Sequence, residues 1–72
     1  MFVYRSTAGD ISIIKDSGRW HALFQEELLG SYTNPEQAAF DLSVGHVLDV
    51  PGGVDLKKLG IPRDLARWEQ VE

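Results

Sequence analysis

The residues best suited to chemistry in this chain are its two histidines, His21 and His46, and its carboxylates. His46 is followed by Asp49 and Asp55, and an imidazole with two carboxylates is a donor set that zinc accepts. Nothing in the spacing of these three residues determines a common geometry, since they lie in a stretch expected to be mostly loop. We therefore expect a plain loop histidine here, with no metal site and no cofactor.

A hydrolase would need an activated nucleophile, or two carboxylates in different surroundings. Ser12, Ser17 and Ser43 have no motif around them that would activate a hydroxyl. Glu26 and Glu27 lie on an expected hairpin tip, where water would solvate both carboxylates alike. We expect no catalytic residue and predict that the chain is not an enzyme.

The composition indicates one small folded domain, residues 1–72, with an acidic excess. The 72 residues are 43% hydrophobic and 25% charged, the balance of a globular protein, and the net charge is -4. Neither half of the chain is basic, whereas binding to a phosphate backbone depends largely on electrostatic attraction. We therefore expect a protein partner rather than a nucleic acid or a membrane.

Cysteine is absent from the chain, so packing and hydrogen bonds must supply its stability. Apolar runs such as residues 38–40 are far shorter than the roughly 18 residues that cross a bilayer. Residues 1–5 lack the basic start and the long apolar stretch of a secretory signal. These features predict a cytoplasmic protein with no membrane segment.

Alternating apolar residues predict two antiparallel strands at residues 2–6 and 11–15. In the second, Ile13 is expected on one face and Ile14 on the other. Residues 16–18 then form a hairpin turn, because Gly18 can adopt the positive φ that such turns need.

Two further strands are expected at residues 19–25 and 28–32. Trp20 and Phe24 should face the core. Alternation also places Leu28 on the same face as Gly30 and Tyr32. Because a glycine inside a strand weakens the ladder, Gly30 is expected to mark a bulge or a close approach by another backbone, that of the following helix.

A helix is predicted over residues 35–44. Asn34 is its N-cap, Pro35 occupies a position where its missing N–H costs nothing, and Gln37 completes a capping box. Gly45 ends the helix. Residues 46–50 are expected to be a short extended segment, followed by a turn at residues 51–53.

The remaining tail is expected to wrap over an open side of the sheet and helix. Trp68 anchors it, and a short helical turn runs from Pro62 through about Arg67. The predicted fold class is α+β: an antiparallel meander of three to four strands, with one helix, residues 35–44, packed on one face and this C-terminal wrap.

The chain contains the run "GRW" at residues 18–20 and then the run "LGSYTNPEQAA" at residues 29–39. This order of motifs is similar to that of the plant ethylene-response-factor DNA-binding domain and of the arm-binding domains of phage integrases. The matching residues are Trp20, Leu29, Gly30, Tyr32, Asn34, Glu36, Ala38 and Ala39. The resemblance implies three strands with a helix packed across them, and DNA binding through the exposed sheet face. The whole chain also resembles, in layout, short bacterial proteins of unknown activity.

This sequence departs from that pattern in charge. Its strands offer only Arg5, Lys15, Arg19 and His21, interspersed with acids, and the tail after Gly45 has no counterpart. Nucleic-acid binding through the sheet face is therefore the alternative and not the leading hypothesis.

The candidate contact residues are those expected on the sheet face away from the helix: His21, Leu23, Leu29 and Ile14. Leu23 and Leu29 would form an exposed apolar pair if the tail leaves them uncovered, and such patches mark interaction sites. We predict a small non-catalytic binding or accessory module whose partner is another protein. The residues do not indicate an oligomeric state.

Overall fold

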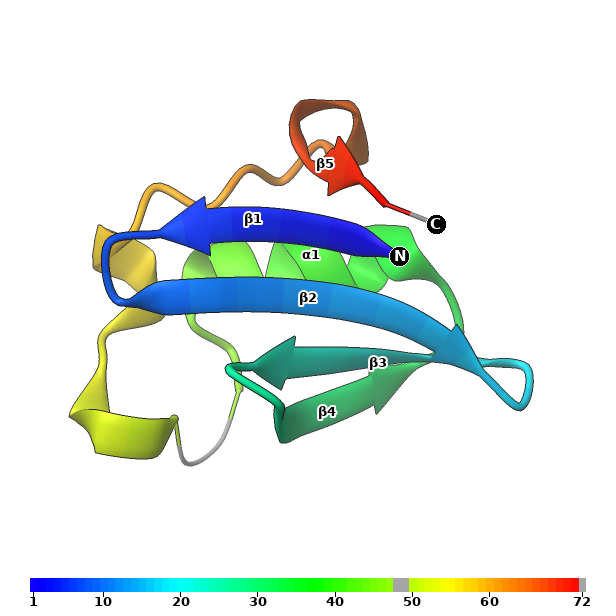
Figure 1. Ribbon diagram of the computed structural model, residues 1–72, viewed down its shortest axis with the longest axis horizontal. Coiled ribbons are helices and arrows are strands. Elements are labelled where there is room, and N and C mark those ends of the chain that lie inside the picture. Colours follow the sequence, from blue (N-terminus) through cyan, green and yellow to red (C-terminus); the bar gives the residue numbers. More distant parts are fainter. Residues whose placement is uncertain (48–49, 72) are drawn as a thin grey trace.

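The computed structural model describes residues 1–47 and 50–71, and it shows a sheet with a helix on one face (Figure 1). The described elements are, in chain order, β1 (Phe2–Ser6), β2 (Gly9–Asp16), β3 (Arg19–Phe24), β4 (Glu27–Tyr32), α1 (Pro35–Val44), three 3-10 turns, η1 (Pro51–Gly53), η2 (Leu56–Lys58) and η3 (Leu65–Arg67), and β5 (Glu69–Gln70). The α+β class and the antiparallel meander are confirmed.

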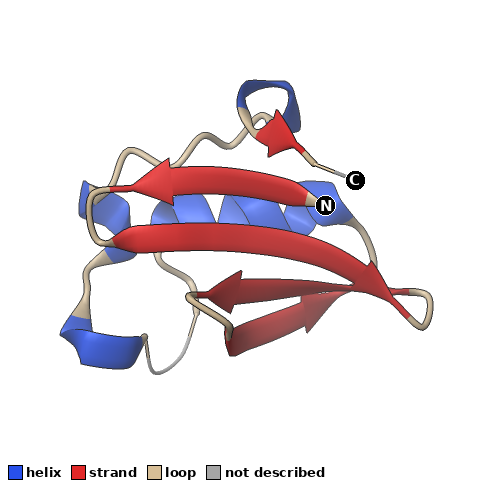
Figure 2. Ribbon diagram, viewed as in Figure 1, coloured by secondary structure: helices blue, strands red, loops and turns tan. Residues whose placement is uncertain are grey.

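The described strands form one sheet in the order β4-β3-β2-β1-β5. Figure 2 shows the strands in one layer with α1 behind them. We call the face that α1 covers the inner face, and the opposite face the outer face. Among the described residues, no helix is both long and apolar enough to span a membrane.

The inner face of the sheet, the helix and the tail share one apolar core. Its buried side chains are Ile11, Ile13, Ala22 and Phe24 from the sheet, Ala38, Ala39 and Leu42 from α1, and Leu56, Ile61 and Trp68 from the tail. The core therefore needs residues from the whole length of the chain, which is how a small domain buries enough apolar surface to fold.

Helix α1 has the predicted bounds and the predicted ends. The Asn34 side chain accepts a hydrogen bond of 2.7 Å from the Gln37 backbone N–H. The Gln37 side chain donates to Asp41 at 2.8 Å, so the return bond of a capping box is replaced by a bond along the helix. Gly45 ends the helix at φ 71, and the N–H groups of Gly45 and His46 donate to the Leu42 and Asp41 carbonyls, which is a Schellman motif.

The hairpin turns use left-handed backbone conformations. Ser17 and Gly18 have φ of 54 and 77, as the predicted turn requires, and Gln25 and Glu26 have φ of 48 and 73 in the β3–β4 turn. Neither of the latter is a glycine, and such residues cost roughly 1 kcal/mol or more each in this region. Neighbouring hydrogen bonds hold the turn: the Gln25 backbone N–H donates to the Asp10 carbonyl at 3.0 Å, and its side chain donates to the Ala8 carbonyl at 3.2 Å.

Strand β4 contains the predicted bulge, and the bulge changes which residues face outward. Ala22 is opposite Gly30 whereas Leu23 is opposite Leu28, so Leu29 is the extra residue. The expectation that Leu28 shares a face with Gly30 is therefore wrong, because one inserted residue reverses the alternation. The close approach of the helix at Gly30 is also wrong: the atoms nearest to a Cβ built there belong to the Tyr32 ring, at 3.3–3.5 Å.

The tail packs on the inner side and on the free edge of β1, leaving the outer face open. Trp68 is buried, its indole N–H donates to the Pro62 carbonyl at 2.8 Å, and its ring lies 5.9 Å from that of Tyr4. The helical turn is shorter than expected and forms η3. Strand β5, which was not predicted, pairs with β1 beside it (Figure 1). Within the segment at residues 46–50, Leu48 and Asp49 lie outside the described residues.

Candidate functional site

The outer face of β2, β3 and β4 holds a shallow depression lined mainly by apolar side chains. Its cavity volume is about 310 Å³, and its lining residues are Ile14, Asp16, His21, Leu23 and Leu28. We call it the apolar depression. Leu23 lies opposite Leu28 across β3 and β4, and Ile14 lies opposite His21 across β2 and β3. The antiparallel register therefore brings together residues that are up to fourteen positions apart.

Leu28 is the most exposed of the apolar lining residues. Its exposed fraction is 62%, whereas Ile14 and Leu23 are half-buried. Burying a large aliphatic side chain contributes roughly 1.5–3 kcal/mol when it is fully removed from water. Leu28 gains little of this in the isolated domain, so a partner that covers it would supply a favourable contribution to binding.

The polar lining residues of the apolar depression are Asp16 and His21, and the imidazole of His21 is held by a serine. The His21 Nδ1 atom lies 2.7 Å from the Ser31 hydroxyl oxygen, and the two residues are directly opposite each other in β3 and β4. A serine within hydrogen-bond reach of an imidazole is part of the arrangement that activates a nucleophile, but that arrangement also needs a third group to orient the base. Among the described residues, no carboxylate accepts a hydrogen bond from the His21 ring. The pair therefore places a hydrogen-bonded imidazole in the lining of the apolar depression.

Three of the four residues predicted to contact a partner lie together in this depression: Ile14, His21 and Leu23. The placement of Leu29 on the outer face is wrong. Its side chain packs against the core, because the bulge turns it inward. Leu28 takes its place beside Leu23, and the signal that could have found it is Gly30, since a bulge next to that glycine reverses the faces of the residues before it.

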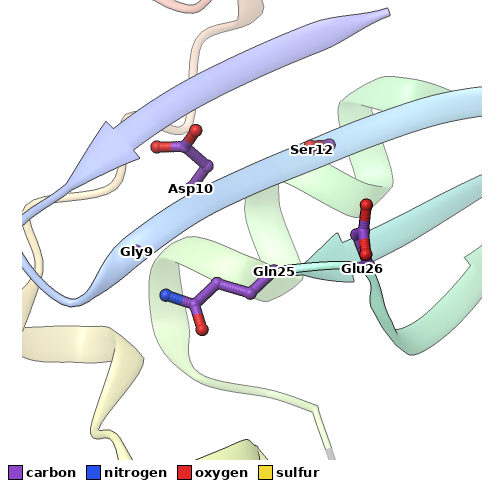
Figure 3. A pocket seen from close by; sticks show the side chains of 5 residues that line it. All are labelled: Gly9, Asp10, Ser12, Gln25 and Glu26. Atoms are coloured by element: carbon purple, nitrogen blue, oxygen red, sulfur yellow. The ribbon is translucent and has the colours of Figure 1, made fainter.

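A second, polar depression lies at the end of the outer face where the β1–β2 and β3–β4 turns meet. Its volume is about 420 Å³, and it is lined by Gly9, Asp10, Ser12, Gln25 and Glu26 (Figure 3). We call it the acidic depression. Figure 3 shows the Asp10 carboxylate on β2 and the Glu26 carboxylate on the β3–β4 turn. The sequence predicts Glu26 only as a solvated residue of a hairpin tip, and no pattern in it indicates that Glu26 and Asp10 line one depression.

Arg5 is the cation opposite Asp10 in the register of β1 and β2, and Asp10 lines the acidic depression. The Arg5 guanidinium forms an ion pair of 3.3 Å with the exposed Glu69 carboxylate. The hydrogen bond and charge of Glu69, with a smaller contribution from Asp10, raise the pKa of Arg5 above its ordinary value. The charge of Arg5 is therefore mainly compensated by Glu69.

The other cations of the strands do not gather on the outer face. The Lys15 ammonium lies 5.8 Å from the Trp20 ring centroid, on the inner side of the strand pair. Arg19 lies opposite Asp16 at the far end of β2 and β3. On the outer face of the described strands, Arg5 and Arg19 each lie beside a carboxylate. Nearby negative charge opposes contact with a phosphate backbone.

The described residues contain no group of three histidine, aspartate, glutamate or cysteine side chains that could hold a metal ion. Asp49, considered with His46 and Asp55 as a ligand set, lies outside the described residues. Comparison of the chain with protein-family models, with curated proteins and with solved structures found no match. The resemblance of residues 18–44 to DNA-binding domains stays a prediction, and the geometry of the outer face carries the functional argument.

Proposed function

We propose that this protein is a small non-catalytic binding module that docks another protein on the outer face of its sheet. One observation carries the proposal: Leu28, with an exposed fraction of 62%, stands beside Ile14 and Leu23 in the apolar depression. Scattered exposed apolar residues are normal on a protein surface, but contiguous ones lining a depression are characteristic of interaction sites.

The other exposed aromatic or aliphatic side chains differ from this group. Phe40 on α1 has an exposed fraction of 42%, and the Arg63 guanidinium lies over its ring at 5.2 Å from the centroid. Such a cation covers the ring and interacts favourably with it. Met1, at 41%, precedes β1. The apolar depression is thus the better candidate for a docking surface.

The polar lining suits recognition more than catalysis. The bond to Ser31 holds His21 at the edge of the apolar depression, and a few oriented polar groups in a mainly apolar site are what usually give a binding site its specificity. The surface is open and shallow, which fits a segment of a protein better than a small molecule that needs to be enclosed.

The test is an affinity capture from native cell extract with the immobilised wild-type chain, Leu28→Asp and Phe40→Asp. We expect a protein that the wild type and Phe40→Asp both retain and that Leu28→Asp loses, because a buried unpaired carboxylate opposes docking. Urea unfolding of the three chains checks that each is folded. Retention of the same proteins by all three chains would contradict the proposal.

A parallel titration with duplex and single-stranded DNA at low salt examines the alternative. Salt-sensitive binding in the micromolar range would favour a nucleic-acid-binding function and count against a protein partner. We expect no such binding, because the arginines of the outer face lie beside carboxylates.

A further inference from the structure

The apolar and acidic depressions lie next to each other along β2. Asp10, Ser12, Ile14 and Asp16 alternate with the core residues of that strand, so all four are on the outer face. Ser12 lines the acidic depression and is directly opposite Leu23, which lines the apolar depression. The two hollows therefore form one continuous surface with an apolar middle and a polar end.

The charge of this surface differs between its two ends. Asp16 lies opposite Arg19 at one end, so the charges there balance. At the other end, Arg5 lies opposite Asp10 and is paired with Glu69, so among the described residues there three carboxylates, Asp10, Glu26 and Glu69, accompany one arginine. The excess negative charge of the outer face is therefore concentrated at the Asp10 and Glu26 end.

The position of Glu26 is set by its neighbours. Gln25 is hydrogen-bonded to the carbonyls of Ala8 and Asp10, and a Cβ at Gly9 would collide with the Gln25 side chain. The β3–β4 turn is thus clamped onto the β1–β2 turn. A carboxylate on a clamped turn loses less conformational freedom on binding than one on a free loop, which favours its use in recognition.

We propose that the occupant of the outer face is a segment of a partner protein that carries an apolar side chain and a lysine or arginine about 7–13 Å apart, the distance that two to four residues span in a strand. This range follows from β2, where Asp10 is two residues from Ser12, the residue opposite Leu23, and four residues from Ile14. The apolar side chain covers Leu28, Leu23 and Ile14, and the cation enters the acidic depression between Asp10 and Glu26. This inference rests on the proposed function and adds the chemistry and direction of the partner.

Complementary charge is the reason for choosing a basic segment as the occupant. A second copy of this chain, with a net charge of -4, would bring like charge to the surface, and like charges placed against each other oppose association. A lysine or arginine at the acidic end pairs with Asp10 and Glu26, and in an extended segment it lies about two to four residues from the apolar anchor.

The probe is a phage-displayed library of random dodecapeptides selected on the full wild-type chain. We expect the enriched peptides to share an apolar residue with a lysine or arginine about two to four positions away. Their affinity is then measured for the wild type, for the double variant Asp10→Asn with Glu26→Gln, and for Leu28→Ser. Glu36→Gln, on the exposed side of α1, is the matched control for loss of a surface carboxylate.

We expect affinity to fall about fivefold to tenfold in the double variant, and the difference to shrink at high salt, because exposed charge pairs are weak and screened. Leu28→Ser should weaken binding as well, and Glu36→Gln should not. Equal urea midpoints of the variants confirm that folding is unchanged.

Two results would overturn the inference in distinguishable ways. Peptides that depend on Leu28 but lack a basic residue, and that bind the double variant unchanged, would refute the basic partner and leave the proposed docking face standing. If no peptides are enriched, or if the peptides bind Leu28→Ser and the double variant as tightly as the wild type, both the docking face and the basic partner are refuted.

Discussion

The two faces of the sheet are made by the same strands and differ in what covers them. Ile13 and Ile14 are consecutive in β2, yet Ile13 is fully buried beneath α1 while Ile14 is half-buried in the apolar depression. The inner face also receives Leu42 from the helix and Trp68 from the tail. The outer face receives no layer from the described residues (Figure 1).

The difference shows where a domain of this size can place a function. With 72 residues, folding buries only about 60% of the surface of the unfolded chain, so the inner face is needed for stability. The outer face contributes less to stability and is therefore available for a partner. This comparison can be tested with substitutions on each side of the sheet.

The largest effect is expected at Trp68, which closes the inner side. Trp68→Ala should lower the free energy of unfolding by about 3–5 kcal/mol, because it leaves a cavity beside Tyr4 and removes the donor to the Pro62 carbonyl. Phe40→Ala, at an exposed aromatic residue of α1, is the control and should cost less than about 1 kcal/mol. Urea unfolding followed by circular dichroism measures both. A loss for Trp68→Ala of less than about 1 kcal/mol would show that Trp68 contributes little to the core.

A matched pair of neighbours compares the two faces directly. Ile13→Ala should cost about 2–4 kcal/mol, since the side chain is fully buried, whereas Ile14→Ala should cost less than about 1 kcal/mol. The same urea experiment gives both values. If Ile14→Ala is as costly as Ile13→Ala, the outer face is part of the stabilising core and the comparison fails.

The smallest effect concerns pH and the edge of the inner face. Burial of the ring, and then the negative charge of Asp41, raise the pKa of Tyr32 to about 12. In the unfolded chain the phenol ionises near its ordinary pKa of about 10. Between these values the folded state holds the proton more tightly, so the contribution of Tyr32 to stability is present below about pH 10 and is lost as the pH rises to about 12.

Tyr32→Phe isolates this contribution, because phenylalanine keeps the ring and cannot ionise. The difference in urea midpoint between wild type and Tyr32→Phe should change in this pH window, to the disadvantage of the wild type. A difference that stays constant from about pH 9 to about pH 12 would show that Tyr32 is as exposed to solvent as a residue of the outer face.

Local patterns predicted those parts of the fold that depend on local chemistry. Helix α1 begins after Asn34 and ends before Gly45, as the capping residues indicated, because a cap satisfies backbone groups within a few residues of itself. The turn at Gly18 was also predicted, since its φ of 77 is a property of the turn alone. The same alternation identified Ile14, His21 and Leu23 as members of one face.

Long-range pairing explains what was missed. Strand β5 has only two residues, Glu69 and Gln70, and no apolar alternation, so it is defined by its pairing with β1 and not by its own composition. Leu29 was assigned to the wrong face because a bulge beside Gly30 shifts the register by one residue, and the sequence pattern indicates such a bulge without giving the position of the extra residue.

The sequence by itself determined the helix with both caps, the meander of strands and the alternation that separates two faces, because these follow from backbone conformation and hydrogen bonding between near neighbours. Tertiary structure alone decided that Leu28 is exposed, that the tail closes the inner side, and that Asp10 and Glu26 line one depression at an end of the outer face. These depend on strand register and on the clamped turns, through contacts between residues far apart in the chain.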